Sequence, residues 1–223
     1  MRLLSTKILS QNFRDKLLMN QFSLVEQTFI KINFLENPKI DRIFDRLIFT
    51  SRNAVNAVFS CPKIQKMIEG KIIYCVGKKT ASLLAENGQK TTKIAQNSLE
   101  LAQFLAKNYK DESFSYFCGK LRIPDLEEIL PVRGIHIKPI EVYTTHLQEH
   151  TVKGHFDGIL FFSPSGVRGY AQNNGFENVH SFCLGNSTAK EVALHTSQYT
   201  VANEPSESQL LLSLKNHITL YEE

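Results

Sequence analysis

The chain contains an internal repeat, and this repeat constrains the fold more than any other feature of the sequence. The segment LIFTSRNAV at residues 47–55 resembles ILFFSPSGV at residues 159–167, and YCVGKKTASLL at 74–84 resembles FCLGNSTAKEV at 182–192. Near the N-terminus, STKILSQNFRDKL resembles CGKLRIPDLEEIL. The three offsets are 112, 108 and 113 residues. Similar segments at similar offsets favour a duplicated structural unit.

Short apolar runs alternate with helical stretches along both copies. This alternation is typical of an α/β protein with parallel sheets. We therefore predict two similar domains, each a parallel sheet flanked by helices. The expected strands cover residues 3–4, 25–32, 47–50, 72–76, 114–118, 135–143, 158–162 and 181–184.

The repeat leaves two domain partitions open. We name its parts X, Y, X′ and Y′ in chain order, where X and X′ contain the third pair of segments and Y and Y′ contain the first two pairs. The domains are either XY followed by X′Y′, divided near residue 112, or YX′ as one continuous domain with X and Y′ combined in the other. The second partition needs crossovers near residues 33 and 147. Sequence pattern does not separate the two, because each βαβ unit looks the same in either assembly.

Composition excludes several classes of protein. With 223 residues, 42% hydrophobic and 10% aromatic, the chain suits a folded protein with one large or two small domains. No apolar run approaches the roughly 20 residues that span a bilayer, and the N-terminus lacks the apolar core of a secretory signal. We expect a cytoplasmic protein with no membrane partner. A net charge of +4 is low for a nucleic-acid binder, so we expect no nucleic acid and favour an anionic small molecule.

The four cysteines form no CxxC pair. Cys75, Cys118 and Cys183 lie in strand-like runs, whereas Cys61 does not. Buried free thiols, rather than a disulfide or a zinc site, are the interpretation we prefer.

Each Y segment contains two strand-to-helix junctions, at residues 50–53 and 77–80 and again at 163–166 and 185–188. Parallel strands bind ligands at their carboxyl ends, and the free amides that begin a helix attract anions. Hydroxyl side chains there also serve simply as helix caps, so both interpretations remain for each residue. The candidate anion-binding residues at or near these junctions are Thr50, Ser51, Arg52, Lys78, Lys79, Thr80, Lys120, Arg122, Ser163, Ser165, Gly166, Ser187 and Thr188.

Two motifs match known functional patterns in part, but their surroundings in the sequence do not fit those patterns. Gly77-Lys78 lacks the leading glycine of a Walker site, since residue 72 is isoleucine, and no GxGxxG occurs. The string HLQEH at 146–150 matches a metallopeptidase pattern that needs a helix, but here it follows a strand-like run. We interpret it as a solvated connector and expect no metal and no cofactor.

The repeated motifs resemble the uroporphyrinogen-III synthase family, whose enzymes close the tetrapyrrole ring on the way to haem. The segments that carry the resemblance are LIFTSRNAV, YCVGKKTASLLAENG, the spacing of Gly119, Arg122 and Leu126, IEVYTT around Tyr143, LFFSPSGV and CLGNSTA. They span residues 47–192. The chain departs from the family at Ser5-Thr6-Lys7, where the family usually has Thr-Arg.

The resemblance implies a domain organisation that the residues alone leave open. Residues 34–146 would form a continuous domain inserted between residues 1–33 and 147–223. The two domains would be joined by a two-stranded connector, with the ligand cleft between them.

The resemblance also implies a reaction. A lyase of this family takes the linear hydroxymethylbilane, which carries eight carboxylates, and removes its terminal hydroxyl as water to give an electrophilic azafulvene. Ring D then reacts at its substituted carbon, and a spirocyclic intermediate leads to uroporphyrinogen III with ring D inverted. Tyr143 matches the tyrosine that the family places beside the cleft, and we assign it a catalytic role as hydrogen-bond or proton donor to the departing hydroxyl. The alternative is a tyrosine that packs on the connector.

The resemblance carries Gly119 over to the substrate-binding residues. We expect a monomer that makes a transient contact with the preceding enzyme of the pathway. The competing hypothesis is a non-catalytic two-domain binding protein for an anionic small molecule, which would have the same junctions.

Overall fold

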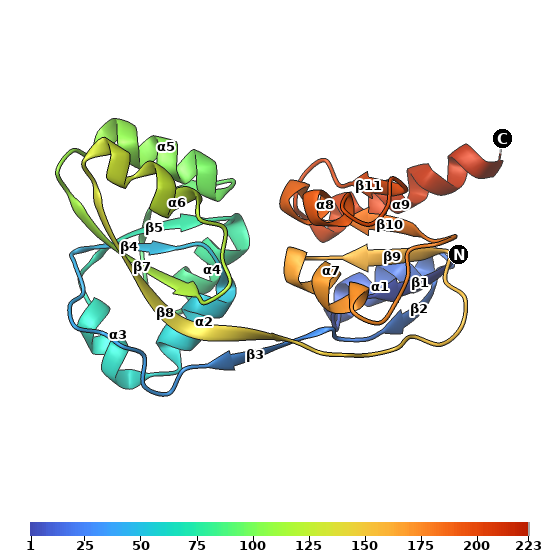
Figure 1. Ribbon diagram of the computed structural model, residues 1–223, viewed down its shortest axis with the longest axis horizontal. Coiled ribbons are helices and arrows are strands. Elements are labelled where there is room, and N and C mark those ends of the chain that lie inside the picture. The colour runs from blue at the N-terminus through green and yellow to red at the C-terminus, as the bar shows by residue number, and fades with distance from the viewer. Residues whose placement is uncertain (223) are drawn as a thin grey trace. The chain divides into compact units, whose positions relative to one another are not determined.

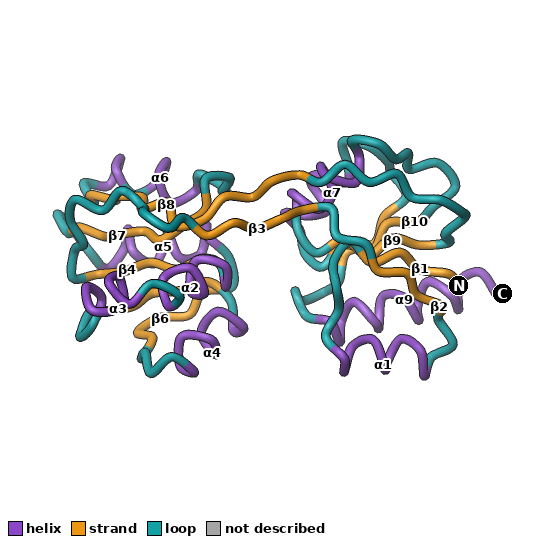
Figure 2. Tube along the Cα trace, turned by 90° about the horizontal axis from the view of Figure 1, so that it is seen from below, coloured by secondary structure: helices purple, strands orange, loops and turns teal. Residues whose placement is uncertain are grey.

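The computed structural model describes residues 1–222, and the chain divides into two compact units (Figure 1). Unit 1 comprises Met1–Lys31 and the chain from His146 onwards, and unit 2 comprises Ile32–Thr145. The chain passes from unit 1 to unit 2 within strand β3 (Ile30–Phe34) and returns within β8 (His136–Leu147). These two strands are neighbours in one sheet (Figure 2). That the units fold independently, as domains with boundaries at residues 33 and 146, stays a prediction.

Unit 1 contains a five-stranded parallel sheet in the order β11-β10-β9-β1-β2. Its strands are β1 (Arg2–Ser5), β2 (Ser23–Glu26), β9 (Gly158–Phe161), β10 (His180–Cys183) and β11 (Tyr199–Val201). Its helices are α1 (Gln11–Met19), α7 (Pro164–Ala171), α8 (Asn186–Val192) and α9 (Glu207–Glu222).

Unit 2 contains a six-stranded sheet in the order β3-β8-β7-β4-β5-β6, which is parallel from β8 to β6. Its other strands are β4 (Arg46–Phe49), β5 (Ile72–Val76), β6 (Thr91–Ala95) and β7 (Ser113–Gly119). Its helices are α2 (Arg52–Phe59), α3 (Pro62–Ile68), α4 (Lys78–Glu86), α5 (Ser98–Asn108) and α6 (Asp125–Ile129), and a short 3₁₀ turn covers Pro131–Arg133.

The two sheets have the same topology. The order β11-β10-β9-β1-β2 in unit 1 corresponds to β6-β5-β4-β7-β8 in unit 2. The strands of Y therefore share a sheet with those of X′, and the strands of Y′ share a sheet with those of X. The predicted fold class, α/β with two parallel sheets flanked by helices, is confirmed.

Both faces of each sheet are buried, which explains why the central strands are apolar throughout. In β4, Leu47 and Phe49 pack with α2, α3 and α4, while Ile48 packs on the opposite face with α5 and α6. In unit 1, Leu4 packs with α7 and α8, and Leu3 packs with α1 and α9. The carboxyl ends of the strands are thus held in place by two helical layers in each unit.

Two expectations about the strands are wrong. Residues 25–32 do not form one strand: β2 ends at Glu26 and belongs to unit 1, whereas β3 begins at Ile30 and pairs in the other sheet. The strands β6 and β11 were not predicted, because both are short edge strands that carry polar residues such as Thr92 and Thr200. The prediction of buried free thiols is confirmed for Cys75, Cys118 and Cys183, and Cys61 is a partly exposed free thiol.

The HLQEH string begins at the end of β8, and its last three residues have no regular structure. It therefore lacks the helix on which the metallopeptidase pattern depends. Among residues 1–222, no group of three or more His, Cys, Asp or Glu side chains is placed to hold a metal ion. Within the same range, no helix is both long enough and apolar enough to cross a membrane.

Candidate functional site

The first junction of unit 2 joins β4 to α2. Ser51 has extended backbone and begins the helix, and its Oγ accepts a hydrogen bond of 3.1 Å from the amide of Ala54. Thr50, one residue earlier, shares a hydrogen bond of 2.8 Å with the hydroxyl of Tyr116 on β7. The cap satisfies one of the free amides in the first turn of α2 and leaves others directed beyond the edge of the sheet.

The equivalent junction of unit 1 has nearly the same geometry. Ser163 precedes α7, and its Oγ accepts a hydrogen bond of 3.1 Å from the amide of Gly166. The hydroxyl of Ser165 lies 3.2 Å from Ser163 Oγ. Ser51 and Ser163 are therefore equivalent helix caps. Both lie at the carboxyl ends of parallel strands, where α/β proteins bind ligands.

The second junctions begin with glycine. Gly77 has a φ of +84°, a conformation that side-chain-bearing residues rarely adopt, and α4 starts immediately after it. The side chains of Thr80 and its equivalent Thr188 are buried, with 5% and 3% exposure. The helix starts thus offer backbone amides outward, while these two threonine side chains point into the protein.

Tyr143 on β8 connects the first junction of unit 2 to β7. Its hydroxyl lies 3.1 Å from Ser51 Oγ, and its backbone pairs with Gly119 at an irregularity in the β7–β8 register. A Cβ atom built on Gly119 would lie 2.5 Å from Cε2 and Cζ of the Tyr143 ring. Glycine at position 119 is therefore what allows the tyrosine hydroxyl to reach the start of α2.

Burial raises the pKa of the Tyr143 hydroxyl above its usual value near 10, while hydrogen bonds from Ser51 and Asn53 partly oppose this rise. The group consequently keeps its proton at neutral pH and can act as a donor. Asn53 was not among the predicted site residues, and only its place two residues after Ser51 could have suggested it.

Arg122 lies in the loop after β7, and its guanidinium is already engaged. It forms a bidentate pair with Glu127, with two hydrogen bonds of 2.8 Å, and a third hydrogen bond of 2.9 Å with Glu141. It also donates to the backbone carbonyl of Gly119. These carboxylates raise the pKa of Arg122 further. The residue fixes the loop beside Tyr143, which sequence pattern did not reveal because its partners lie on α6 and β8.

The remaining predicted basic residues are exposed. Arg52 begins α2, Lys78 and Lys79 begin α4, and Lys120 follows β7. The amide of Lys120 donates a hydrogen bond of 3.1 Å to the carbonyl of Tyr143. At the carboxyl edge of unit 2 the structure therefore gathers Ser51, Tyr143, Gly119, Lys120 and Arg122, with α4 starting from the neighbouring strand.

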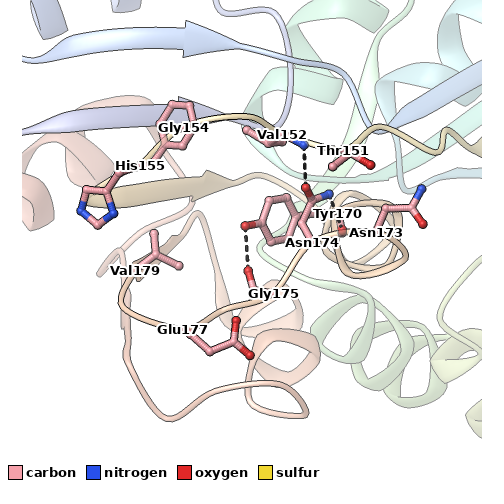
Figure 3. Close-up of a pocket in the computed structure, with 11 residues that line it drawn as sticks. Thr151, Val152, Gly154, His155, Tyr170, Asn173, Asn174, Gly175, Glu177 and Val179 are labelled. Carbon is pink, nitrogen blue, oxygen red and sulfur yellow. Dashed lines mark hydrogen bonds between the residues drawn. The ribbon is translucent and has the colours of Figure 1, made fainter.

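A cavity of about 270 Å³ lies elsewhere, near the amino ends of β9 and β10 in unit 1 (Figure 3). Its walls include the loops at 151–156 and 173–179 and the side chain of Tyr170, whose hydroxyl donates to the carbonyl of Gly175. None of the predicted site residues lines it. The cavity therefore lies at the amino ends of the strands, whereas the helix starts lie at their carboxyl ends.

Together, the fold and these junctions define a class: a duplicated α/β protein whose helix starts and polar side chains gather at the carboxyl edges of parallel strands. The family model described as "Uroporphyrinogen-III synthase HemD" matches residues 13–211. The chain therefore belongs to the uroporphyrinogen-III synthase family, and it is a cyclising lyase of haem biosynthesis.

Solved structures of this family have the same fold. The uroporphyrinogen-III synthetase of Helicobacter pylori 26695 is 22% identical, with a TM-score of 0.68 and coverage of 99% of this chain and 100% of that chain. A mutant uroporphyrinogen III synthase of Thermus thermophilus is 14% identical, with a TM-score of 0.68 and coverage of 98% and 99%. The wild-type Thermus protein is 15% identical, with a TM-score of 0.51 and coverage of 100% and 98%. No curated protein matches the chain significantly in sequence.

Proposed function

We propose that the chain converts hydroxymethylbilane to uroporphyrinogen III, with loss of water and inversion of ring D, and that Tyr143 is the catalytic residue. The observation that carries this proposal is the placement of the Tyr143 hydroxyl, 3.1 Å from Ser51 Oγ at the start of α2. Only 7% of Tyr143 is exposed, so its hydroxyl is a neutral donor in a largely desolvated position.

The hydrogen bonds around Ser51 orient the tyrosine proton. Ser51 Oγ already accepts from the amide of Ala54, so it can give its own hydrogen to the Tyr143 oxygen. The Tyr143 hydrogen then remains for the hydroxyl that leaves the substrate. The C–O bond breaks with its electron pair on oxygen, and the oxygen departs as water once it has received a proton. The pyrrole nitrogen supplies the electrons that form the azafulvene and loses its own proton.

The eight carboxylates of the substrate require many hydrogen-bond donors. We assign these donors to both units, where they lie at the carboxyl ends of the strands of each sheet. Backbone amides at the helix starts supply donors that need no particular side chain. Exposed cations add charge, and the capping hydroxyls complete the set. The proposed binding residues are Thr50, Ser51, Arg52, Lys78, Lys79, Thr80, Gly119, Lys120, Arg122, Ser163, Ser165, Gly166, Ser187 and Thr188.

Within this set the residues have different roles. Thr80 and Thr188 are buried, so each supports its helix start from inside. Arg122 is held by Glu127 and Glu141 and fixes the loop that carries Gly119 and Lys120. The main task of such a site is positioning, because ring closure without inversion occurs without an enzyme and has to be disfavoured.

We further propose that the protein works in the cytoplasm as a monomer and contacts the preceding enzyme of the pathway transiently. Membership of a biosynthetic family that acts on a small molecule supports the cytoplasmic location. Sedimentation velocity of the purified protein, alone and mixed with that enzyme, tests the monomer and the contact separately.

The decisive experiment supplies freshly made hydroxymethylbilane and separates the uroporphyrinogen isomers after oxidation. We expect the type III isomer to form faster than the type I isomer forms spontaneously. Formation of type I alone, at the spontaneous rate, would contradict the proposal and favour a non-catalytic binding protein.

A further inference from the structure

Two exposed aliphatic side chains occupy equivalent positions of the repeat. Ile8 is 59% exposed and Leu121 is 49% exposed, and they are separated by the 113-residue offset that relates Lys7 to Lys120. A single exposed aliphatic residue is ordinary on a protein surface. Exposure at the same place in both copies calls for a reason beyond chance.

Both residues lie at the carboxyl edge of their sheet. Ile8 is in the loop between β1 and α1, and Leu121 is in the loop between β7 and α6. Five residues further on, Phe13 and Leu126 are again equivalent, and both are buried, with 2% and 0% exposure. The two loops therefore follow a common path. Phe13 and Leu126 face the core, whereas Ile8 and Leu121 face solvent.

A glutamate on the neighbouring strand holds each loop. Glu26 pairs in register with Ser5 at the end of β1, and its carboxylate accepts from the amide of Leu9. Glu141 pairs with Cys118 near the end of β7, and its carboxylate accepts from Arg122. Because these anchors lie within two residues of Ile8 and Leu121, the exposed side chains are presented from fixed backbone. A surface that is ordered before binding loses less entropy when a ligand arrives.

A lysine precedes both Ile8 and Leu121, and the lysine of unit 1 lies against an aromatic ring and a carboxylate. Lys7 precedes Ile8, and its ammonium lies 4.2 Å from the centroid of the Phe162 ring and 3.3 Å from a carboxylate oxygen of Glu207. Phe162 directly follows β9 and precedes the helix cap Ser163. In unit 2, the exposed Lys120 precedes Leu121. Such a surface suits a ligand that has both anionic arms and flat apolar rings.

We propose that Ile8 and Leu121 bind the faces of the substrate's pyrrole rings, while the helix starts and the exposed Lys120 bind its carboxylates. This inference rests on the proposed function. The helix starts satisfy charge, yet they offer nothing to the ring faces, which lose contact with water when the bilane folds into position. Burial of apolar surface against an aliphatic side chain is favourable, and Ile8 and Leu121 supply such surface in both units.

The test uses Ile8→Ser, Leu121→Ser and the double variant. The matched controls are Leu194→Ser in unit 1 and Val132→Ser in unit 2, which are 76% and 79% exposed and precede β11 and β8, at the amino edges of the sheets. We expect the KM for hydroxymethylbilane to rise about fivefold in each test variant and more than tenfold in the double variant. The controls should stay within about twofold of the wild type. Circular dichroism melts establish that all five proteins are folded.

Two outcomes would overturn the inference. One is an unchanged KM in the folded double variant, and another is an equal rise in the controls. If the first outcome comes with lost self-association in sedimentation, Ile8 and Leu121 belong instead to a contact between copies of the chain. Failure of the proposed function itself looks different, because the wild-type protein would then form no type III isomer.

Discussion

The ring of Tyr143 fills the space that a side chain at position 119 would occupy. A Cβ on Gly119 would lie 2.5 Å from two ring carbons and 2.9 Å from the hydroxyl oxygen. The two residues face each other across β7 and β8, at the register irregularity next to the carboxyl edge. The glycine and the tyrosine therefore act as a pair, in which the first fixes where the hydroxyl of the second lies.

Gly119→Ala should displace the Tyr143 ring and lower kcat at least tenfold, with an overpacking cost of roughly 1–3 kcal/mol in the free energy of unfolding. Isomer-resolved kinetics and urea unfolding measure the two effects. The double variant Gly119→Ala/Tyr143→Ala removes the clash and should be more stable than the sum of the single changes predicts. Additive losses would show that the two residues are not sterically coupled.

Tyr143→Phe keeps the ring and removes the donor. We expect the ring-closing rate to fall about 10²-fold, in line with the loss of a general acid, while the melting temperature changes little, because the lost hydroxyl interacts mainly with Ser51 at the edge of the sheet. The measurement is the initial rate of type III formation together with the ratio of type III to type I. An undiminished rate and type III yield would leave Tyr143 as a packing residue.

The duplicated fold was predictable from the sequence, but the pairing of Gly119 with Tyr143 was not. Strands such as residues 47–49 are predicted from their apolar sequence, because both faces of the sheet are buried. Edge strands such as 199–201 carry too little apolar signal, so β11 was missed. Caps such as Ser51 follow from local chemistry.

The other site features depend on contacts between residues far apart in the chain. Arg122 was predicted to bind an anionic ligand, yet it donates a hydrogen bond to Glu141, 19 residues away. Thr80 and Thr188 were predicted as anion-binding or capping hydroxyls at helix starts, yet packing buries both. Neither the spacing of charges nor the repeat contains this information, because it arises from how helices and neighbouring strands meet at one edge of a sheet.

The two equivalent serine caps allow the catalytic and structural roles of Ser51 to be separated. Ser51→Ala and Ser163→Ala each remove one capping hydrogen bond of 3.1 Å and should each cost about 1 kcal/mol of stability. Only Ser51 also bonds to Tyr143, so only Ser51→Ala should lower kcat by several-fold beyond its effect on KM. Urea unfolding and steady-state kinetics on both variants make the comparison. Equal losses of kcat would mean that Ser51 acts merely as a cap.

A pair of histidines should make unit 1 sensitive to acid. His180 on β10 and His217 on α9 have ring centroids 4.0 Å apart, and His180 Nε2 lies 2.9 Å from the hydroxyl of Thr200. Burial, followed by the neighbouring His217, lowers the pKa of His180 to about 4, and burial also lowers the pKa of His217. Between pH 6.5 and 4 the unfolded chain therefore binds more protons than the folded protein does, and stability falls as the pH falls.

Since the His180 ring is partly exposed, screening limits the effect of His180 to about 1–2 kcal/mol over this interval. Melting temperatures measured from pH 7 to pH 4 should decline less steeply in His180→Asn than in the wild type. His155→Asn, which changes an exposed histidine 3.6 Å from Asp157, gives the comparison curve for a surface histidine. If His180→Asn follows the wild-type curve, the acid sensitivity has another source, because a histidine with equal pKa values in both states contributes no slope.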